Sequence, residues 1–549
     1  MPHDPEPVDD LSPTAETTGR VLPAALLIFL SLQLFAAVRS PVPGVNEPHY
    51  LSKARHYWDA NWCAGDHFLE SANTHLVFYQ TVGLLTRWLP LEAVAWVGRA
   101  LAHLLLAFAW ANLVPRLMPG RWSSLWVVWV FLALAACGNL SGEWIVGGVE
   151  AKVFAYAGVF WSIAAFLENR WNRAAVYAGL AISFHPVVGV WSLVSVAFAG
   201  AVAMIQRHRG PTTVDAETLS VTQALLPIAL LVLSALPGLI PAFEVVAGGS
   251  AQHSFAANYI QVFFRLRHHL DPMRFSAAAY AGYSLLIGFW LIGRHWTRPH
   301  RNEAWWTTFV LGSVLIALVG LCVGWNAQPP RQIPAGEKGY YAVRLLLMKF
   351  YPFRLADALV PLAAAVVFVG LVLGWCGADR PSPGGVRRHA YRWLVPLLYS
   401  AFLGFALLRP ALDRNPSQMD KQRHADWLDV CRWVAAETPK NAHFLTPTRE
   451  SWAFKWYAER AEYVVFKDSP QDAASLVEWN QRLGALNVWA KENYEGQSYS
   501  TEALDKLQHE TGITHIVTRR LGPFDIEPVY RNGSYRVYQL EDAAASERR

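Results

Sequence analysis

The stretch GVNEPHYLSKARHYWDANWCAGDHFLESANTHLVFY, residues 44–79, directly follows the first apolar run of a 549-residue chain. It is rich in acids, histidines and aromatic residues, although the whole chain is 53% hydrophobic and only 16% charged. A soluble protein of this size carries about a quarter charged residues, so the composition indicates an integral membrane protein. We therefore interpret residues 39–75 as the first external loop of a multispanning protein, and we expect Glu47 to be its most important acid.

Apolar runs long enough to cross about 30 Å of hydrocarbon recur along the chain. The first has no cleavage site behind it and further runs follow, so it predicts an anchor helix and not a signal peptide. Two short runs meet at His185-Pro186, where the proline predicts a broken pair of helices. The sequence thus predicts an α-helical polytopic membrane protein of about eleven spans, at residues 21–38, 91–114, 122–138, 151–167, 174–184, 187–205, 219–243, 273–292, 304–325, 355–375 and 391–408.

The charges of the connections predict the orientation in the membrane. Five connections are basic, as cytoplasmic loops usually are, and they begin at Pro115, Glu168, Gln206, Gly293 and Asp379. With the amino terminus inside, the long connections that carry acids and histidines face outward, namely residues 39–75, 139–150, 244–272 and 326–353. This arrangement requires residues 76–90 to lie at the membrane surface and not to cross the membrane. It predicts a multi-pass protein of the inner (cytoplasmic) membrane.

The two ends of the chain differ from its apolar middle. Residues 1–19 are acidic and rich in Pro and Thr, and are predicted to form a disordered cytoplasmic tail. Residues 20–409 are predicted to form the transmembrane domain. Residues 410–549 have a lower hydrophobic density and are predicted to form a small external, periplasmic, soluble α/β domain.

The pattern within this carboxy-terminal segment is typical of a parallel core with helical crossovers. Helices are predicted at residues 421–437 and 472–490, with short buried strands at 444–445, 463–466 and 513–517. Residues 529–538 predict a hairpin whose Asn532-Gly533 suits a type I′ turn. The basic residues of the segment are interpreted as a solvated face, namely Arg449, Lys455, Arg460 and Lys467.

Asn46-Glu47-Pro48-His49-Tyr50 opens the loop and Asn73-Thr74-His75-Leu76 lies near its end. These segments resemble motifs of the GT-C superfamily of membrane glycosyltransferases, in its protein O-mannosyltransferase and aminoarabinose-transferase branch. There an Asp-Glu-x-x-Tyr type motif opens the first loop; here Asn46 stands in place of the aspartate and leaves Glu47 as the substitute. GEWIVGGVEAK (142–152) and YPFRLAD (351–357) resemble still more closely an uncharacterised bacterial membrane family with planctomycete members.

The resemblance implies a polyprenyl-phosphate-sugar-dependent glycosyltransferase at the external face of the cytoplasmic membrane, with an acidic loop residue as base. Its partners would be a lipid-linked sugar donor, membrane lipids, and a protein, lipid or glycan acceptor. Such chemistry requires a carboxylate at the acceptor hydroxyl and cations at the carrier phosphate.

The catalytic candidates are Glu47, Glu143 and Glu150. Glu47 lies within about ten residues of a span and can stay near the membrane interface, although a solvated loop acid is an equal alternative. Glu150 lies at the mouth of an apolar helix, where an ionisable group is costly and is functional by default. Its structural alternative is a charge that complements the helix dipole beside Lys152.

Two external segments supply cations for a phosphate, and the predicted substrate- and phosphate-binding residues are His49, Tyr50, Arg265, His268, His269, Lys349 and Arg354. Arg354 and Asp357 are one helical turn apart, so an ion pair between them is a serious structural alternative. A divalent metal could help to neutralise the leaving group. The histidines of the loop show no diagnostic ligand spacing, however, and no metal site is predicted.

Two other functions stay open at this point. A transporter often has repeated halves and matching broken helices, which this sequence does not show. A non-catalytic membrane scaffold that presents its carboxy-terminal domain agrees with the loss of the motif's first acid at Asn46. The five cysteines show no metal spacing, and the basic residues lie in short clusters between apolar runs, so a nucleic acid is not expected as a partner.

Overall fold

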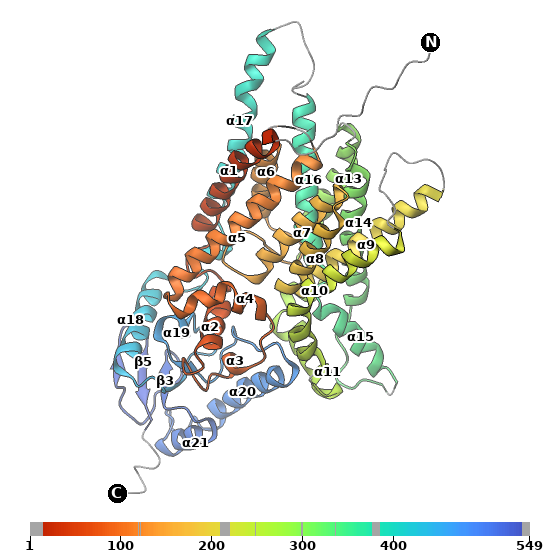
Figure 1. Ribbon diagram of the computed structural model, residues 1–549. Helices are drawn as coiled ribbons and strands as arrows, with labels where there is room; N and C mark the ends of the chain where they lie inside the picture. Colours follow the sequence, from red (N-terminus) through yellow and green to blue (C-terminus); the bar gives the residue numbers. More distant parts are fainter. Residues whose placement is uncertain are drawn as a thin grey trace, which may run out of the picture.

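A computed structural model describes residues 15–118, 120, 122–208, 220–247, 249–297, 300–334, 336–375 and 385–540. It consists of a bundle of long helices with a small sheet domain at one end (Figure 1). The bundle helices are α1 (Ala15–Arg39), α5 (Leu91–Leu113), α6 (Ser123–Cys137), α7 (Ala151–Leu167), α8 (Trp171–Phe184), α9 (Pro186–His208), α10 (Val221–Ala247), α13 (Ala277–Gly293), α14 (Glu303–Gly324), α16 (Arg354–Trp375) and α17 (Gly385–Leu408).

Each of the predicted apolar runs coincides with one of these helices, and the chain breaks at His185 between α8 and α9 as predicted. Within the described residues, six helices are long and apolar enough to cross a membrane, namely α1, α5, α9, α10, α14 and α16. Three apolar helices are shorter: α6, α7 and the segment Trp393–Leu408 of α17. The predicted polytopic helical fold is therefore confirmed, whereas the number of spans stays a prediction. Of the predicted tail, residues 1–14 lie outside the described part, and α1 already begins at Ala15.

Short elements cover the end of the bundle that carries the sheet domain. They are α2 (Glu47–Trp58), α3 (His67–Glu70), α4 (Leu76–Gln80), η1 (Val82–Arg87), α11 (Ala251–Tyr259), η3 (Ile260–Arg265), α12 (Arg267–Leu270), η4 (Pro272–Arg274), α15 (Lys338–Lys349) and η6 (Leu412–Arg414). Because α4 and η1 hold only five and six residues, they cannot cross a bilayer. Residues 76–90 thus stay at this end, as the predicted topology requires. At the opposite end lie η2 (Val114–Arg116) and η5 (Arg294–Trp296).

The carboxy-terminal domain contains a five-stranded sheet of order β2-β1-β3-β5-β4. Its strands are β1 (His443–Leu445), β2 (Ala461–Glu462), β3 (His515–Thr518), β4 (Tyr530–Arg531) and β5 (Arg536–Gln539), and its helices are α18 (Lys421–Glu437), α19 (Phe454–Ala458), α20 (Ala473–Glu492) and α21 (Thr501–Thr511). β1 pairs in parallel with β2 and β3, whereas β5 is antiparallel to both β3 and β4. Asp472 and Ser500 cap α20 and α21 by accepting a backbone N–H.

Two details of this domain differ from the prediction. The strand expected at 463–466 is β2, two residues earlier, because the carbonyl of Val465 accepts from the Trp479 indole instead of joining the sheet. The type I′ turn is wrong: Arg531 pairs with Arg536, which leaves a four-residue connection, and Gly533 has no positive φ. The ring of Tyr535, in this connection, is buried against Trp427.

The first loop and the carboxy-terminal domain lie on the same end of the bundle and contact each other directly. Asp66 accepts a hydrogen bond from the backbone N–H of Glu462 at 3.0 Å. His67 Nε2 lies 2.9 Å from the Ser475 carbonyl oxygen. The loop and the domain therefore share one face, and the assignment of that face to the outside stays a prediction.

Lys455 lies at the centre of this contact. Its ammonium is 3.1 Å from Asp66, 2.8 Å from Glu462 and 2.8 Å from Asp468. Although burial raises the pKa of Asp468, the Lys455 ammonium holds this pKa well below its usual range. The solvated face predicted from Lys455 and Arg460 is wrong, because both are buried. The Lys455 ammonium pairs with three acids, and Arg460 donates to backbone carbonyl groups.

We expect the substitution Lys455→Met to destabilise the protein by about 3–5 kcal/mol, because it leaves three buried carboxylates without their cation. Thermal unfolding in detergent, with limited proteolysis of the carboxy-terminal domain, measures the effect. Lys440→Met is the matched control, since Lys440 is exposed in the same domain. If the Lys455 variant unfolds at the same temperature as the control, the cluster does not hold the domain on the loop.

Candidate functional site

A cavity of about 580 Å³ lies between the helical bundle, the first loop and the carboxy-terminal domain. The 139–150 connection, the break between α8 and α9, η3 with α12, and the first turn of α16 form its walls. All but one of the predicted site residues line it, namely His49, Tyr50, Glu143, Glu150, Arg265, His268, His269, Lys349 and Arg354. The exception is Glu47.

The charged residues around the cavity are mostly positive. The cations that line it are Lys152, Arg265, Lys349, Arg354 and Lys467, and the carboxylates are Glu143, Glu150 and Asp413. Burial lowers the pKa of His269 to about 3, so this imidazole is neutral at pH 7. The excess of positive charge suits an anionic group, such as a phosphate.

Glu143 and Arg354 form the central pair of the cavity. Arg354 Nε lies 3.1 Å from Glu143 Oε2, and Arg354 Nη1 lies 2.8 Å from His185 Nε2. The guanidinium also stacks 4.0 Å above the ring of Tyr351. Among the described residues, Glu143 Oε1 has no hydrogen-bond partner, although the side chain is only 6% exposed. One oxygen of this carboxylate is thus paired with Arg354, and the other is buried without a hydrogen-bond partner among the described residues.

The alternative ion pair between Arg354 and Asp357 is wrong. Asp357 accepts from the backbone N–H of Leu140 at 3.1 Å and of Ser141 at 2.8 Å. The Ser141 hydroxyl donates a third hydrogen bond at 2.6 Å. Asp357 therefore fastens α16 to the 139–150 connection, and this contact holds Glu143 beside Arg354.

Glu150 reaches the carboxy-terminal domain through Asn46. Asn46 Nδ2 donates to Glu150 Oε1 at 2.7 Å, and Lys467 Nζ donates to Asn46 Oδ1 at 2.9 Å. Burial raises the pKa of Glu150, while Lys152, 3.3 Å away, opposes this shift. Burial and the neighbouring Arg265 lower the pKa of Lys467 to about 8. Asn46 is therefore a neutral bridge at the position where the resembled motif has an acid.

Glu47 does not line the cavity. It is fully buried and pairs with Arg99, with Nε to Oε1 at 2.6 Å and Nη2 to Oε2 at 2.7 Å. The backbone N–H groups of Gly44 and Val149 donate to the same carboxylate at 2.6 Å and 2.8 Å. We correct the expectation that Glu47 is the acid at the reaction: its carboxylate is fully used in joining α2, α5 and the 139–150 connection.

The other predicted residues contact both sides of the cavity. Tyr50 Oη lies 3.3 Å from His75 Nε2, and His49 Nδ1 lies 3.2 Å from Asp468. Arg265 donates to the Lys467 carbonyl at 2.7 Å. The rings of His268 and His269 are 4.0 Å apart, and burial lowers the pKa of Lys349.

Three charged residues of the cavity were not predicted from the sequence as site residues, namely Lys152, Lys467 and Asp413. Lys152 carried the same signal as Glu150, an ionisable group in the first turn of an apolar helix. Lys467 gave no such signal, because nothing in the sequence of an α/β domain indicates which of its lysines faces the membrane domain.

Within the described residues, no group of three or more His, Cys, Asp or Glu side chains is placed to hold a metal ion. Lys152 lies 3.5 Å from Glu143 and 3.3 Å from Glu150, and Arg354 also pairs with Glu143. Because cations already pair with these two carboxylates, the donor set does not fit a divalent ion.

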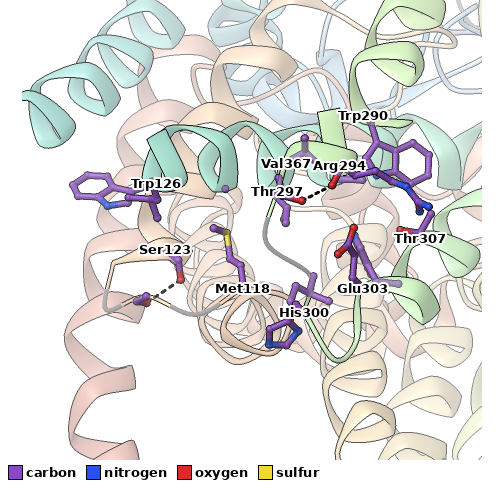
Figure 2. A pocket seen from close by; sticks show the side chains of 18 of the residues that line it. Met118, Ser123, Trp126, Trp290, Arg294, Thr297, His300, Glu303, Thr307 and Val367 are labelled. Atoms are coloured by element: carbon purple, nitrogen blue, oxygen red, sulfur yellow. Dashed lines mark hydrogen bonds between the residues drawn. The ribbon is translucent and has the colours of Figure 1, made fainter. Parts of the chain in front are cut away.

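A second cavity, of about 340 Å³, lies beside η2 and η5 at the opposite end of the bundle. Figure 2 shows it from close by. From Arg354 to Gly370, α16 rises about 24 Å between the two cavities. The second cavity has mainly apolar walls, such as Trp290 and Val367, with Arg294 and Glu303 also lining it. It lacks the dense cluster of paired charges, so the first cavity is the stronger candidate for chemistry.

The fold and the cavity define a multi-pass membrane protein with a charged site at the end of its helical bundle. A domain of unknown function, DUF6798, matches residues 425–486. No curated protein sequence matches the chain.

The solved structures that are similar to the chain include the following three. The Archaeoglobus fulgidus oligosaccharyltransferase in complex with Zn and sulfate has a TM-score of 0.40 at 13% identity, over 91% of this chain and 67% of that one. AglB from Archaeoglobus fulgidus, in complex with an inhibitory peptide and a dolichol-phosphate, has a TM-score of 0.40 at 12% identity, over 91% and 69%. ArnT from Cupriavidus metallidurans in the apo state has a TM-score of 0.39 at 13% identity, over 95% and 97%. Likeness at this level says nothing about substrate.

Proposed function

We propose that the chain is a glycosyltransferase that moves a sugar from a polyprenyl-phosphate-linked donor to an acceptor hydroxyl in the charged cavity. The observation that carries the proposal is that five cations line one cavity together with Glu143, one of whose carboxylate oxygens is buried without a hydrogen-bond partner among the described residues. Such a set combines what the reaction needs, since cations stabilise the phosphate that leaves and a carboxylate takes the acceptor proton.

In this mechanism Glu143 is the general base. The acceptor oxygen attacks the anomeric carbon and its proton passes to Glu143 Oε1. The bond from the anomeric carbon to the phosphate oxygen breaks, and its electron pair stays on the phosphate. Arg265, Lys349 and Lys467 hold that phosphate, while Arg354 orients the base through Oε2.

The lipid part of the donor has a route to the membrane along α10. Val245 and Val246 of this helix line the cavity, and Leu233, Ile240 and Phe243 of the same helix are exposed. An apolar helix that borders the cavity and also faces lipid lets a prenyl chain stay in hydrocarbon while its phosphate enters the site.

The proposal is tested with purified protein in nanodiscs and a panel of radiolabelled polyprenyl-phosphate sugars, with release of polyprenyl phosphate as the readout. Mass spectrometry of glycans and lipid-linked sugars in a deletion strain identifies the acceptor. A scaffold or a transporter gives no release from any donor and no change in glycans, and either result would reject the proposal.

Donor binding is expected to weaken as the pH rises through about 8, because Lys467, whose pKa is lowered to about 8 mainly by burial, then loses its charge. Below that pH the ammonium is present and binds the phosphate. The Michaelis constant for the donor, measured between pH 6 and pH 10, should therefore rise on the alkaline side. Lys467→Arg keeps its charge at these pH values, and its profile should lack the rise near pH 8; an identical rise in both proteins would exclude Lys467 as the titrating group.

The orientation is tested by cysteine labelling in a background without native cysteines. We expect Asn61→Cys, in the first loop, to react with a membrane-impermeant thiol reagent added outside the cell. Arg301→Cys, at the opposite end of the bundle, should react only after the membrane is opened. Both positions are exposed. The reverse pattern would place the cavity in the cytoplasm and reject the external site.

A further inference from the structure

A separate crevice of about 290 Å³ lies at the carboxyl ends of β1 and β3. The residues that follow β1, from Thr446 to Glu450, form one wall, and those that follow β3, from Arg519 to Leu521, form another. In the sheet, β2 lies next to β1 on one side of this pair of strands, and β5 lies next to β3 on the other side. In parallel α/β sheets, ligands bind in the crevice at the point where the connections part in this way.

Three arginines and one acid line the crevice. Arg519 donates twice to Glu450, at 2.7 Å each, and Arg520 Nε is 4.0 Å from the same carboxylate. Within the described part of the chain, the only recorded contact of the exposed Arg449 guanidinium is with the ring of Phe466, at 4.8 Å. The crevice therefore keeps an excess of positive charge, and the guanidinium of Arg449 has all its N–H groups free.

The remaining walls suit a ring or a short apolar group. Leu483, Leu486 and Trp489 of α20 line the crevice, and so do Phe264 and Phe466. Thr448 and Asn487 place a hydroxyl and an amide at the edge. Aromatic faces with adjacent polar groups can contact a ring that carries hydroxyl groups, and the arginines can bind a phosphate or carboxylate attached to this ring.

The crevice is distinct from the charged cavity but shares a partition with it. Phe264 and Phe466 face the crevice, and their chain neighbours Arg265 and Lys467 line the cavity. The ring of Phe466 lies 5.3 Å from the Arg265 guanidinium and 4.8 Å from that of Arg449. The segments Phe264-Arg265 and Phe466-Lys467 therefore separate the crevice from the charged cavity, and each of the two spaces has its own cations.

We propose that this crevice is a second binding site, for a small anion that carries a sugar-like ring with a phosphate or carboxylate group. Arg449 and Arg520 bind the anionic group, and the aromatic and aliphatic walls contact the ring. The site does not depend on sugar transfer in the neighbouring cavity, since none of its wall residues takes part in the proposed reaction.

The test is calorimetric titration of the full chain in nanodiscs with three probes: glucose 6-phosphate, inorganic phosphate and glucose. Glucose 6-phosphate should bind with one site and more tightly than inorganic phosphate, and glucose should not bind. The double variant Arg449→Gln/Arg520→Gln should weaken binding at least about tenfold, as the loss of charge-assisted hydrogen bonds produces. Arg482→Gln is the matched control, because Arg482 stacks on Tyr463 at 4.7 Å in the same domain but outside the crevice.

Hydrogen exchange locates the bound probe. Protection by glucose 6-phosphate in residues 446–450 and 519–521 supports the crevice. Protection confined to residues 143–152 and 349–354 places the anion in the charged cavity and overturns the proposal. Absence of binding at about 10 mM of every probe, or equal binding by the double variant and the control, overturns it as well. None of these readouts requires turnover, so each is distinct from a failure of the proposed function.

Discussion

Replacing Glu143 by glutamine is expected to lower sugar transfer by about 10²–10⁴-fold, the range that positioned acid–base groups contribute. Glutamine has the same shape and its side-chain oxygen can stay beside the Arg354 guanidinium, which lies 3.1 Å from Glu143 Oε2, so the fold should persist. It cannot take a proton, however, and the unpartnered Oε1 of Glu143 is the atom that we propose takes the proton of the acceptor. The rate should fall at saturating donor, with little change in the Michaelis constant, because the lost interaction belongs to the transition state.

Two further variants make this result specific. Glu150→Gln keeps the acceptor for Asn46, so we expect it to affect donor binding more than the rate. Glu303→Gln alters an acid of the second cavity, at the other end of the bundle (Figure 2), and should leave transfer unchanged. A larger rate loss in Glu150→Gln than in Glu143→Gln would reverse the two roles. Full activity in both Glu143→Gln and Glu150→Gln would show that sugar transfer does not take place in this cavity.

The gathering of distant residues in one cavity was predictable from the sequence. Apolar runs of span length fix the helices, and successive helices must return the chain to alternate ends of the bundle. Every second connection therefore lies at the same end, which is why Glu143, Arg265, Lys349 and Arg354 meet although up to about two hundred residues separate them. This prediction follows from the lengths and order of the apolar runs alone, without any information on side-chain packing.

The pairing within the cavity was not predictable, because it depends on directions that the sequence does not contain. Successive helical residues point about 100° apart, so Asn46 and Glu47 at the start of α2 face different surroundings. Asn46 reaches Glu150 in the cavity, and Glu47 turns to Arg99 in the bundle. In the same way, helical spacing suggested an ion pair between Asp357 and Arg354. Asp357 instead accepts hydrogen bonds from the backbone N–H groups of Leu140 and Ser141.

The buried Glu47–Arg99 pair leads to the second large effect. Glu47→Gln is expected to destabilise the protein by about 3–5 kcal/mol, since it leaves the Arg99 guanidinium in the interior without its counter-charge. Arg99 also donates to the Ser40 carbonyl at 2.7 Å, and both Arg99 and Glu47 are fully buried. The loss should appear as a lower unfolding temperature and a lower yield of monodisperse protein in detergent.

A double-mutant cycle separates this structural role from a catalytic one. Glu47→Leu with Arg99→Met removes both charges, and replacing a buried pair by apolar residues is often neutral, so the double variant should recover much of the stability that either single change loses. Transfer per folded molecule should then be close to that of the unmodified protein, because neither side chain lines the cavity. A stable Glu47→Gln protein that binds donor but does not turn over would instead return the catalytic role to Glu47, and the interior pair would have to open during the reaction.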